Sequence, residues 1–360
     1  MGVRIRPAVA ALPAYTPGRP AAAGAAGPAY KLSSNENPYP PLPGVLAATQ
    51  AAVARMNRYP DLTNTAMAAA VSARLGVAPE ALAFGAGSVA VLYHLLAAVC
   101  EPGDEVVYAW RSFEAYPIAV QITGASSVRV PLGPGAVHDL DALHAAITPA
   151  TRVVLLCTPN NPTGPTIGHA DLERFLDAVA AHVLVMVDEA YVEFVDDPAA
   201  ARGLDLVTGR PNVVVLRTFS KAFGLAGFRV GYCVAEPALA AAVRAVSLPF
   251  GISVAAQAAV LASLDVEPAL AERVAALVGA RHQLRDGLRG LGFDVPDAQG
   301  NFIWLPAGPL TPDYAEAFAG GGVVVRPYAA GEPGDGVRIT VGEPEANARV
   351  LDVAAGLTRP

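Results

Sequence analysis

Short runs of consecutive apolar residues recur along the middle of the chain, separated by stretches rich in alanine and leucine. A strand buried on both faces reads as a continuous apolar run, and parallel strands need helical crossovers between them. The pattern therefore predicts an α/β fold in which a mostly parallel sheet is sandwiched by helices. The predicted strands cover residues 105–109, 127–130, 152–157, 182–187, 212–217 and 229–234.

The pattern changes near Pro249, where long stretches of Ala, Leu and Arg begin. Strand-like runs follow at residues 301–305, 322–326 and 336–341. We interpret residues 31–248 as a large domain and residues 249–360 as a smaller α+β domain, on which the first residues of the large domain can pack. Residues 1–30, which contain a Pro, Gly and Ala-rich stretch, predict a flexible N-terminal arm.

Polar side chains follow three of the predicted strands at the point where each strand ends. Asn161 follows residues 152–157, Asp188 follows residues 182–187, and Ser220 and Lys221 follow residues 212–217. In an open parallel sheet, ligands bind outside the carboxyl ends of the strands. These side chains are therefore predicted to meet in one crevice.

Lys221 indicates which ligand the crevice takes. The chain has 25 Lys and Arg residues together, yet only Lys31 and Lys221 are lysines. A primary amine forms a Schiff base with a carbonyl cofactor, whereas a guanidinium stays protonated and does not. The cofactor that this pattern predicts is pyridoxal phosphate (PLP), whose aldehyde is held by a lysine. Lys221 is then also the base that moves the substrate α-proton.

The neighbouring residue types suit the ring of that cofactor. Asp188 can pair with the protonated pyridine nitrogen and keep the ring an electron sink. Asn161 and Tyr191 can hydrogen-bond the 3-oxygen of the ring, which lowers the pKa of the imine. Each type also has an ordinary structural explanation, because Asp188 can cap a helix and Asn-Pro-Thr-Gly at 161–164 can be only a turn.

A phosphate site is predicted beside them. Ser220 and Arg229 can bind phosphate by hydrogen bonds and charge. The turn Gly-Ala-Gly-Ser-Val at residues 85–89 opens a predicted helix, so the backbone N–H groups of Ser88 and Val89 are free to point at an anion. Arg229 alone could be a surface residue, and its position at the head of an apolar run argues against that.

Residues 85–90 also satisfy the dinucleotide fingerprint G-x-G-x-x-A after a short apolar run. A nicotinamide-dependent oxidoreductase is therefore a second hypothesis. It requires an acidic residue about 20 positions later, at the end of the next strand. The strand at residues 105–109 ends in Trp-Arg-Ser-Phe instead, and this hypothesis gives Lys221 no role.

Composition and charge limit the partners. The formal net charge is −7 without a basic cluster, so neither nucleic acid nor anionic lipid is indicated. No uninterrupted apolar run reaches the roughly 18 residues of a membrane span. The three cysteines and six histidines lack metal-site spacing, so we expect no metal. We expect cytoplasmic small-molecule chemistry.

The chain resembles the histidinol-phosphate aminotransferase family of fold-type I PLP enzymes over nearly its whole length. The resemblance implies a homodimer with shared active sites, in which Tyr59 of the partner subunit reaches the phosphate. It further implies that Phe113 stacks on the pyridine ring and that Arg338 binds the substrate α-carboxylate. The further substrate-binding residues that it implies are Asn161, Tyr15, Asn35 and Arg326. The matching segments are residues 15–18, 31–38, 58–61, 158–164, 188–191, 217–232, 301–302 and 337–342.

Two segments depart from the histidinol-phosphate pattern. Residues 87–90 read Gly-Ser-Val-Ala and residues 110–114 read Trp-Arg-Ser-Phe-Glu. Both forms resemble the actinobacterial aromatic amino-acid aminotransferase branch. The resemblance therefore implies transamination of phenylalanine or tyrosine with 2-oxoglutarate, giving the aryl-pyruvate and glutamate. Histidinol-phosphate transamination remains the alternative, because Arg326 and Tyr15 can bind a phosphate, and a PLP-dependent decarboxylase is a more distant one.

Overall fold

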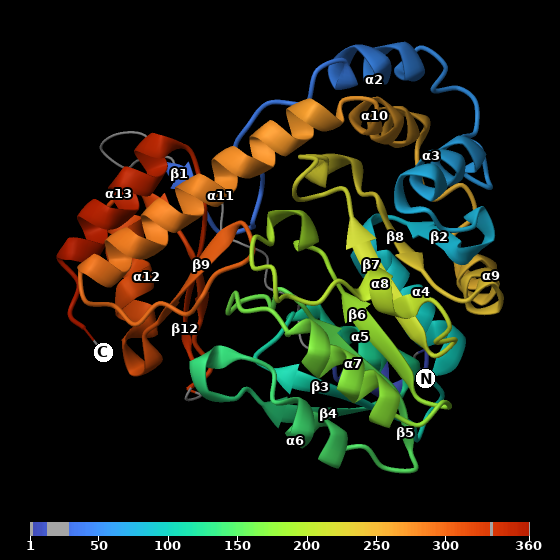
Figure 1. The fold of residues 1–360 in the computed structure, drawn as a ribbon, viewed down its shortest axis with the longest axis horizontal. Helices are drawn as coiled ribbons and strands as arrows, with labels where there is room; N and C mark the ends of the chain where they lie inside the picture. The colour runs from blue at the N-terminus through green and yellow to red at the C-terminus, as the bar shows by residue number, and fades with distance from the viewer. Residues whose placement is uncertain (1–2, 13–28, 332–333, 360) are drawn as a thin grey trace.

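A seven-stranded sheet forms the centre of the larger part of the computed structural model, which describes residues 3–12, 29–331 and 334–359 (Figure 1). The strand order is β2-β8-β7-β6-β5-β3-β4. All neighbouring strands are parallel except β8, which is antiparallel to both β2 and β7. The mostly parallel sheet predicted from the apolar runs is confirmed. Its strands are β2 (Leu82–Gly85), β3 (Glu105–Trp110), β4 (Ser126–Pro131), β5 (Thr151–Cys157), β6 (Leu184–Asp188), β7 (Val213–Thr218) and β8 (Gly231–Val234).

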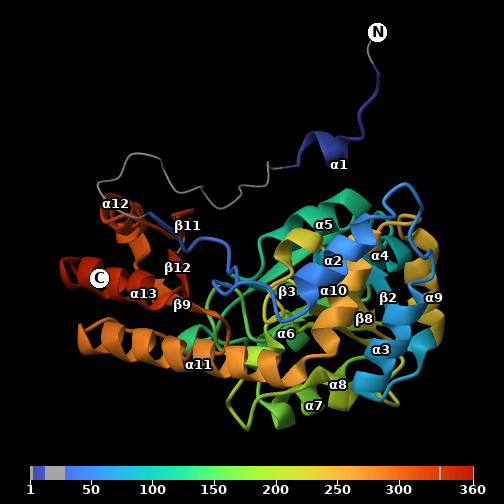
Figure 2. The ribbon, with the colours of Figure 1, turned by 90° about the horizontal axis from the view of Figure 1, so that it is seen from above.

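Both faces of the inner strands of this sheet are buried, which explains why β5, β6 and β7 are nearly continuous apolar runs, whereas the edge strand β4 is largely exposed. Along β7, Val213 and Val215 enter one hydrophobic core, and Val214 and Leu216 enter the other. Figure 2 shows the helices in two layers, with α4 and α5 on one side of the sheet and α7 and α8 on the other. The first layer contains α4 (Gly87–Val99), α5 (Ala115–Thr123) and α9 (Pro237–Val246), and the second contains α6 (Leu140–Ala145), α7 (His169–Ala178) and α8 (Gly203–Val207).

The C-terminal part has its own small sheet, in the order β11-β12-β9, whose strands are antiparallel. A second pair, β1 and β10, is parallel and joins Tyr30 to Val323 in register. The predicted strand at 322–326 is therefore two strands, because the chain leaves one sheet and enters the other at Val325. The elements are β1 (Tyr30–Lys31), β9 (Phe302–Pro306), β10 (Val323–Val324), β11 (Arg326–Tyr328), β12 (Gly336–Thr340), α12 (Thr311–Gly320) and α13 (Pro344–Ala355).

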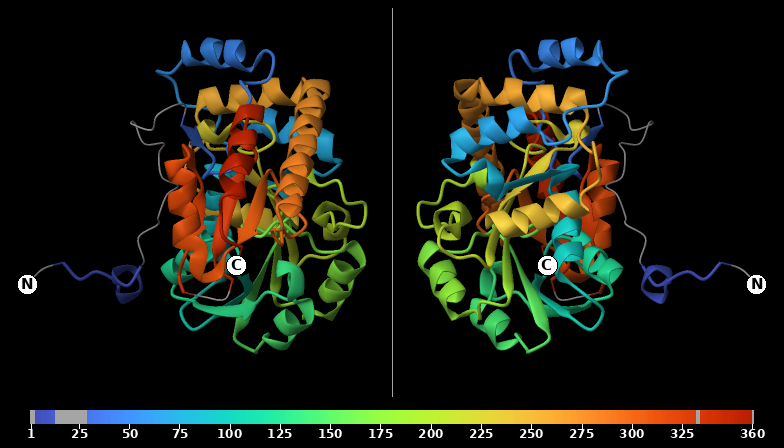
Figure 3. Two further views of the ribbon diagram at one scale, coloured as in Figure 1. Left: turned by 90° about the vertical axis from the view of Figure 1, so that its left-hand side faces the viewer. Right: turned by 90° about the vertical axis from the view of Figure 1, so that its right-hand side faces the viewer.

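Two consecutive helices connect the parts. α10 (Val254–Leu264), capped by the Ser253 side chain, packs against α2 (Val45–Val53) and α3 (Thr65–Leu75), and α2 and α10 lie together at the top of both side views in Figure 3. α11 (Glu267–Gly290) then runs across the molecule to the small sheet. Since α10 packs on helices of the N-terminal half, the domain boundary near residue 249 stays a prediction.

Part of the predicted flexible arm is folded. Residues 7–10 form the short helix α1 (Pro7–Ala10), which contacts α5. The Gln121 amide donates a hydrogen bond to the Ala8 carbonyl at 2.9 Å, and the Arg6 guanidinium donates one to the Ile122 carbonyl at 3.1 Å. Tyr15 and the rest of segment 13–28 lie outside the described residues.

Within the described chain, no single helix is both long and apolar enough to cross a membrane. The bent pair α10 and α11, which meet at 85°, passes that length and composition test only when the two helices are taken together.

Candidate active site

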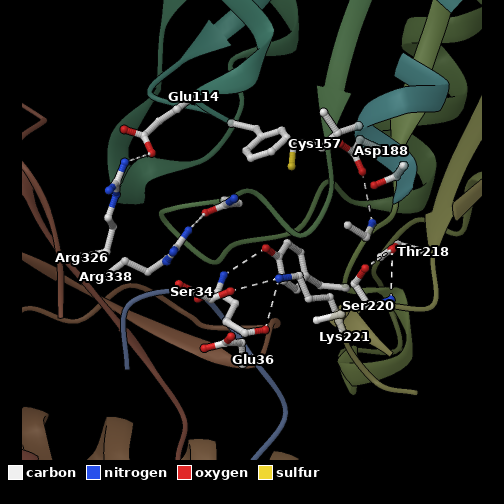
Figure 4. Close-up of a pocket in the computed structure, with 18 of the residues that line it drawn as sticks. Ser34, Glu36, Glu114, Cys157, Asp188, Thr218, Ser220, Lys221, Arg326 and Arg338 are labelled. Carbon is white, nitrogen blue, oxygen red and sulfur yellow. Dashed lines mark hydrogen bonds and ion pairs between the residues drawn. The ribbon is translucent and has the colours of Figure 1, made fainter. Parts of the chain in front are cut away.

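The polar residues at the ends of β5, β6 and β7 lie around one pocket of about 270 Å³ (Figure 4). Strands contribute the floor, the loop before α2 contributes one wall, and β11 and β12 of the small sheet contribute another. Parallel strands end at the same edge of a sheet, which is why segments far apart in sequence meet here. The sequence-predicted residues that line the pocket are Asn35, Ser88, Val89, Phe113, Asn161, Asp188, Tyr191, Ser220, Lys221, Arg229, Arg326 and Arg338.

Tyr59 is not among the lining residues. Its side chain is 81% exposed and its ring stacks on Phe250, with 4.7 Å between the ring centroids. In one copy of the chain this tyrosine therefore lies outside the lining of the pocket. Its role in the site of a partner subunit stays a prediction, as does the role of Tyr15.

Lys221 is half-buried and its side chain lines the pocket. Its Nζ donates hydrogen bonds of 3.2 Å to the carbonyl oxygens of Ser34 and Asn35, and it lies 5.8 Å from the centroid of the Tyr191 ring. Burial, with a smaller contribution from the Arg338 charge, lowers the pKa of Lys221 to about 7. A lysine in this environment is substantially neutral at physiological pH, and a neutral amine is both a nucleophile and a base.

Asp188 is buried near the other end of the pocket. Its Oδ2 accepts a hydrogen bond of 3.0 Å from the Tyr116 hydroxyl, and its Oδ1 accepts one of 3.2 Å from the Ala190 backbone N–H. Burial raises the pKa of Asp188 to about 6, and these two hydrogen bonds oppose that rise. No Lys or Arg side chain in the described segments forms an ion pair with it, so a cationic ring nitrogen would supply the opposite charge that the carboxylate lacks.

An anion cradle lies between β8 and the first turn of α4. A Cβ added to Gly231 would stand 2.1 Å from the Ser88 backbone nitrogen, and one added to Gly87 would stand 2.7 Å from Nη2 of Arg229. Only glycines allow this close approach, and Gly87 also has a φ of +81°. The α4 N–H groups, Arg229 and Ser220 thereby face the same space, which suits a phosphate group.

Arg338, on β12, is buried and hydrogen-bonded only to neutral acceptors within the described chain. Its Nη1 donates to the Asn161 side-chain oxygen at 2.6 Å and to the Tyr328 hydroxyl at 3.0 Å, and its Nη2 donates to the Ser33 carbonyl at 2.8 Å. Its Nε has no hydrogen-bond partner. A buried guanidinium held in this way is suited to a carboxylate brought by a ligand.

Three residues at the site had no role in the sequence analysis. Tyr116 orients Asp188, Tyr328 contacts Arg338, and Glu114 forms an ion pair of 2.7 Å with Arg326. Glu114 and Tyr116 lie one and three residues after Phe113. The residues that they contact lie in remote segments, so no local spacing could reveal the contacts.

With this geometry established, the chain can be compared with known proteins. Residues 28–353 match the family model for aminotransferases of class I and II. This chain belongs to that aminotransferase family. The aromatic amino acid aminotransferase of Streptomyces coelicolor is 54% identical over 352 residues, which cover 98% of this chain and 96% of that protein. The enzyme of the same name from Nocardia farcinica is 49% identical over 358 residues, covering 99% and 98%.

Solved structures agree with this aminotransferase fold. The histidinol-phosphate aminotransferase of Sinorhizobium meliloti in complex with pyridoxal-5'-phosphate superposes with a TM-score of 0.88 at 26% identity, covering 99% of this chain and 97% of that one. A second neighbour, a putative histidinol-phosphate aminotransferase from Erwinia carotovora, has a TM-score of 0.85 at 27% identity, covering 91% and 95%. The predicted fold class is confirmed.

The nicotinamide oxidoreductase hypothesis is wrong for this aminotransferase. A dinucleotide unit places the strand before the glycine turn beside the next parallel strand. Here β2 lies at the edge of the sheet, pairs antiparallel with β8, and is separated from β3 by four strands. Gly87 instead allows Arg229 to approach the start of α4, and Gly85 leaves room for Val91 of that helix.

Proposed function

We propose that this aminotransferase transfers the amino group of an aromatic amino acid, phenylalanine or tyrosine, to 2-oxoglutarate. The observation that carries the proposal is the Lys221 amine, whose pKa is lowered, in one pocket with Asp188 and Arg338. The curated relatives named as aromatic amino acid aminotransferases support the choice of amino donor.

The cofactor is PLP, and the residues present fit it. When bound, PLP supplies an aldehyde carbon and a ring that acts as an electron sink. Asp188 would hold the ring nitrogen, Phe113 would cover a ring face, and the cradle of Ser88, Arg229 and Ser220 would hold the phosphate. These groups all line the same pocket.

The chain's own side chains then divide the remaining work. Arg338 binds the substrate α-carboxylate and so fixes the position of the α-carbon. Lys221 removes the α-proton at Nζ, because its lowered pKa leaves the amine neutral near pH 7. Asn161 and Tyr191 line the same space and can donate to the ring oxygen. Tyr191 also accepts a hydrogen bond of 3.0 Å from Asn35, which keeps its hydroxyl in place.

The homodimer and the cytoplasmic location form part of the same proposal. The exposed stack of Tyr59 on Phe250 supports the dimer, because two aromatic rings on the surface of one copy offer apolar area to another. Tyr59 would then complete the phosphate cradle of the partner subunit.

The pH dependence of cofactor attachment tests the environment of Lys221. Only the neutral amine attacks an aldehyde, so the attachment rate rises with pH until the lysine is fully deprotonated. We expect a rise centred at about pH 7 and a plateau above it, instead of a rise centred on the ordinary value of 10.5. Stopped-flow mixing of cofactor-free protein with PLP measures the rate, with Lys221→Ala as the blank. A rate still increasing steadily above about pH 9 contradicts the lowered pKa.

A single-turnover titration tests the substrate. Histidinol phosphate is the second candidate donor, because Arg326 lies in the pocket and can bind a phosphate. We expect phenylalanine to convert the bound cofactor to its amino form, with loss of its visible absorbance, and histidinol phosphate to do so much more slowly. Preferential reaction with histidinol phosphate would move the assignment to that substrate, and absence of any visible band with added PLP would refute the lysine-bound cofactor.

A further inference from the structure

Two arginines of the pocket stand opposite each other on neighbouring strands. Arg326 on β11 is the register partner of Arg338 on β12, and both side chains line the pocket. Both guanidinium groups lie over the ring of Tyr328, with their Cζ atoms 5.7 and 5.8 Å from its centroid. Like charges directly opposite each other on a sheet are destabilising, so the charge of each needs compensation.

The two charges are compensated differently. Arg338 contacts neutral oxygen atoms of the described chain, as shown above. Arg326 instead donates from Nη2 to Oε2 of Glu114 at 2.7 Å, which Figure 4 shows as a dashed line at one side of the pocket. The site therefore holds one arginine ready for a carboxylate and another that the chain itself has already neutralised.

The members of the ion pair also differ in exposure. The Glu114 side chain is 29% exposed, whereas that of Arg326 is 9% exposed. The carboxylate can therefore turn toward water at small desolvation cost, while Arg326 stays in place over the Tyr328 ring. Glu114 is the partner that can leave.

Transamination requires two side chains of different charge to enter this one pocket in turn. A neutral aromatic side chain can lie against the intact ion pair without burying an isolated charge. The second carboxylate of 2-oxoglutarate or glutamate needs a cation, and Arg326 becomes one when Glu114 is displaced.

We propose that Glu114 is a specificity-determining residue that competes with an anionic substrate side chain for Arg326. Because an acidic substrate must first displace Glu114 from Arg326, the Glu114 carboxylate weakens the binding of acidic substrates and leaves that of aromatic ones unaffected. The inference rests on the proposed function, because it assumes that aromatic and acidic substrates share the site.

The test compares phenylalanine with glutamate, which differ only in their side chains. Single-turnover conversion of the PLP-loaded enzyme gives an apparent dissociation constant and a limiting rate for each. Glu114→Gln keeps a hydrogen-bond acceptor and removes the charge. We expect it to tighten glutamate binding by about 10-fold or more, since a charge-assisted bond no longer has a competitor, and to change phenylalanine binding by less than about 3-fold.

Two further variants make the result specific. Arg326→Gln should weaken glutamate binding by about 100-fold, and adding Glu114→Gln to it should then change nothing, because the competed group is gone. Asp177→Asn is the matched control, since Asp177 makes an ion pair of 2.8 Å with Arg210 at the surface, close to the 2.7 Å between Glu114 and Arg326. It should leave both substrates unaffected. Thermal melting confirms that each variant is folded.

An unchanged or weakened glutamate affinity in Glu114→Gln overturns the inference, as does an equal gain for both substrates. A wild-type enzyme that fails to react with phenylalanine refutes the proposed function instead. The two failures are distinguishable. The first is seen in how the dissociation constants for glutamate and phenylalanine change between the wild type and Glu114→Gln, and the second is seen in the reaction of the wild type with phenylalanine alone.

Discussion

Replacing Lys221 with alanine is expected to reduce transamination by at least about 10⁴-fold, because the same amine attaches the cofactor and moves the α-proton. The cofactor itself should still bind, since Asp188 and the cradle around Arg229 remain. Borohydride reduction followed by peptide mass spectrometry should then find the label on Lys221 in the wild type and no label in the variant.

The other lysine supplies the control. Lys31 forms an ion pair of 2.8 Å with Glu36, and its side chain is 36% exposed. Surface ion pairs contribute little, so Lys31→Ala should retain activity within about twofold and keep the label at position 221. Substantial turnover by Lys221→Ala, or covalent attachment at Lys31, would remove Lys221 from the mechanism.

Replacing Asp188 with asparagine is expected to reduce the limiting rate by about 10³-fold, because the amide has nearly the shape of the carboxylate but cannot stabilise a protonated ring nitrogen by charge. The change should act on the limiting rate more than on substrate affinity, since Arg338 and its contacts are preserved. Single-turnover spectra with phenylalanine separate the two quantities.

Tyr116→Phe separates the effect of the Asp188 charge from the effect of the orientation of its carboxylate. It removes the hydrogen bond of 3.0 Å to Oδ2 of Asp188 and keeps the carboxylate. Because one hydrogen bond to a charged group is lost, we expect the limiting rate to decrease by about tenfold and the pKa of Asp188 to rise. If Asp188→Asn is no slower than Tyr116→Phe, the negative charge is not what the ring requires.

Much of the fold could be predicted from the sequence, because a buried strand appears there as a continuous run of apolar residues. Strands covered on both faces are apolar almost throughout, so the runs at β3, β5, β6 and β7 appeared at nearly their observed positions. The strand at 322–326 was harder, since its division between two sheets depends on which partners pair with it. The strand predicted to begin at Arg229 begins two residues later, at Gly231. Arg229 itself has a left-handed backbone conformation, with a φ of 56°, and lies outside the strand.

The sequence by itself determined the parallel sheet, the polar residues at its strand ends and the unusual lysine, because the apolar run of a buried strand and the chemistry of an amine are local properties. Only the tertiary structure decided that Tyr116 holds Asp188 and that Glu114 neutralises Arg326. The latter two residues are 212 positions apart, one directly before α5 and the other on β11 of the small sheet. The sequence pattern around a charged residue does not identify its ion-pair partner. The pairing that sets the charge of the substrate pocket therefore became visible only in the tertiary structure, where the small sheet packs against the larger part of the molecule.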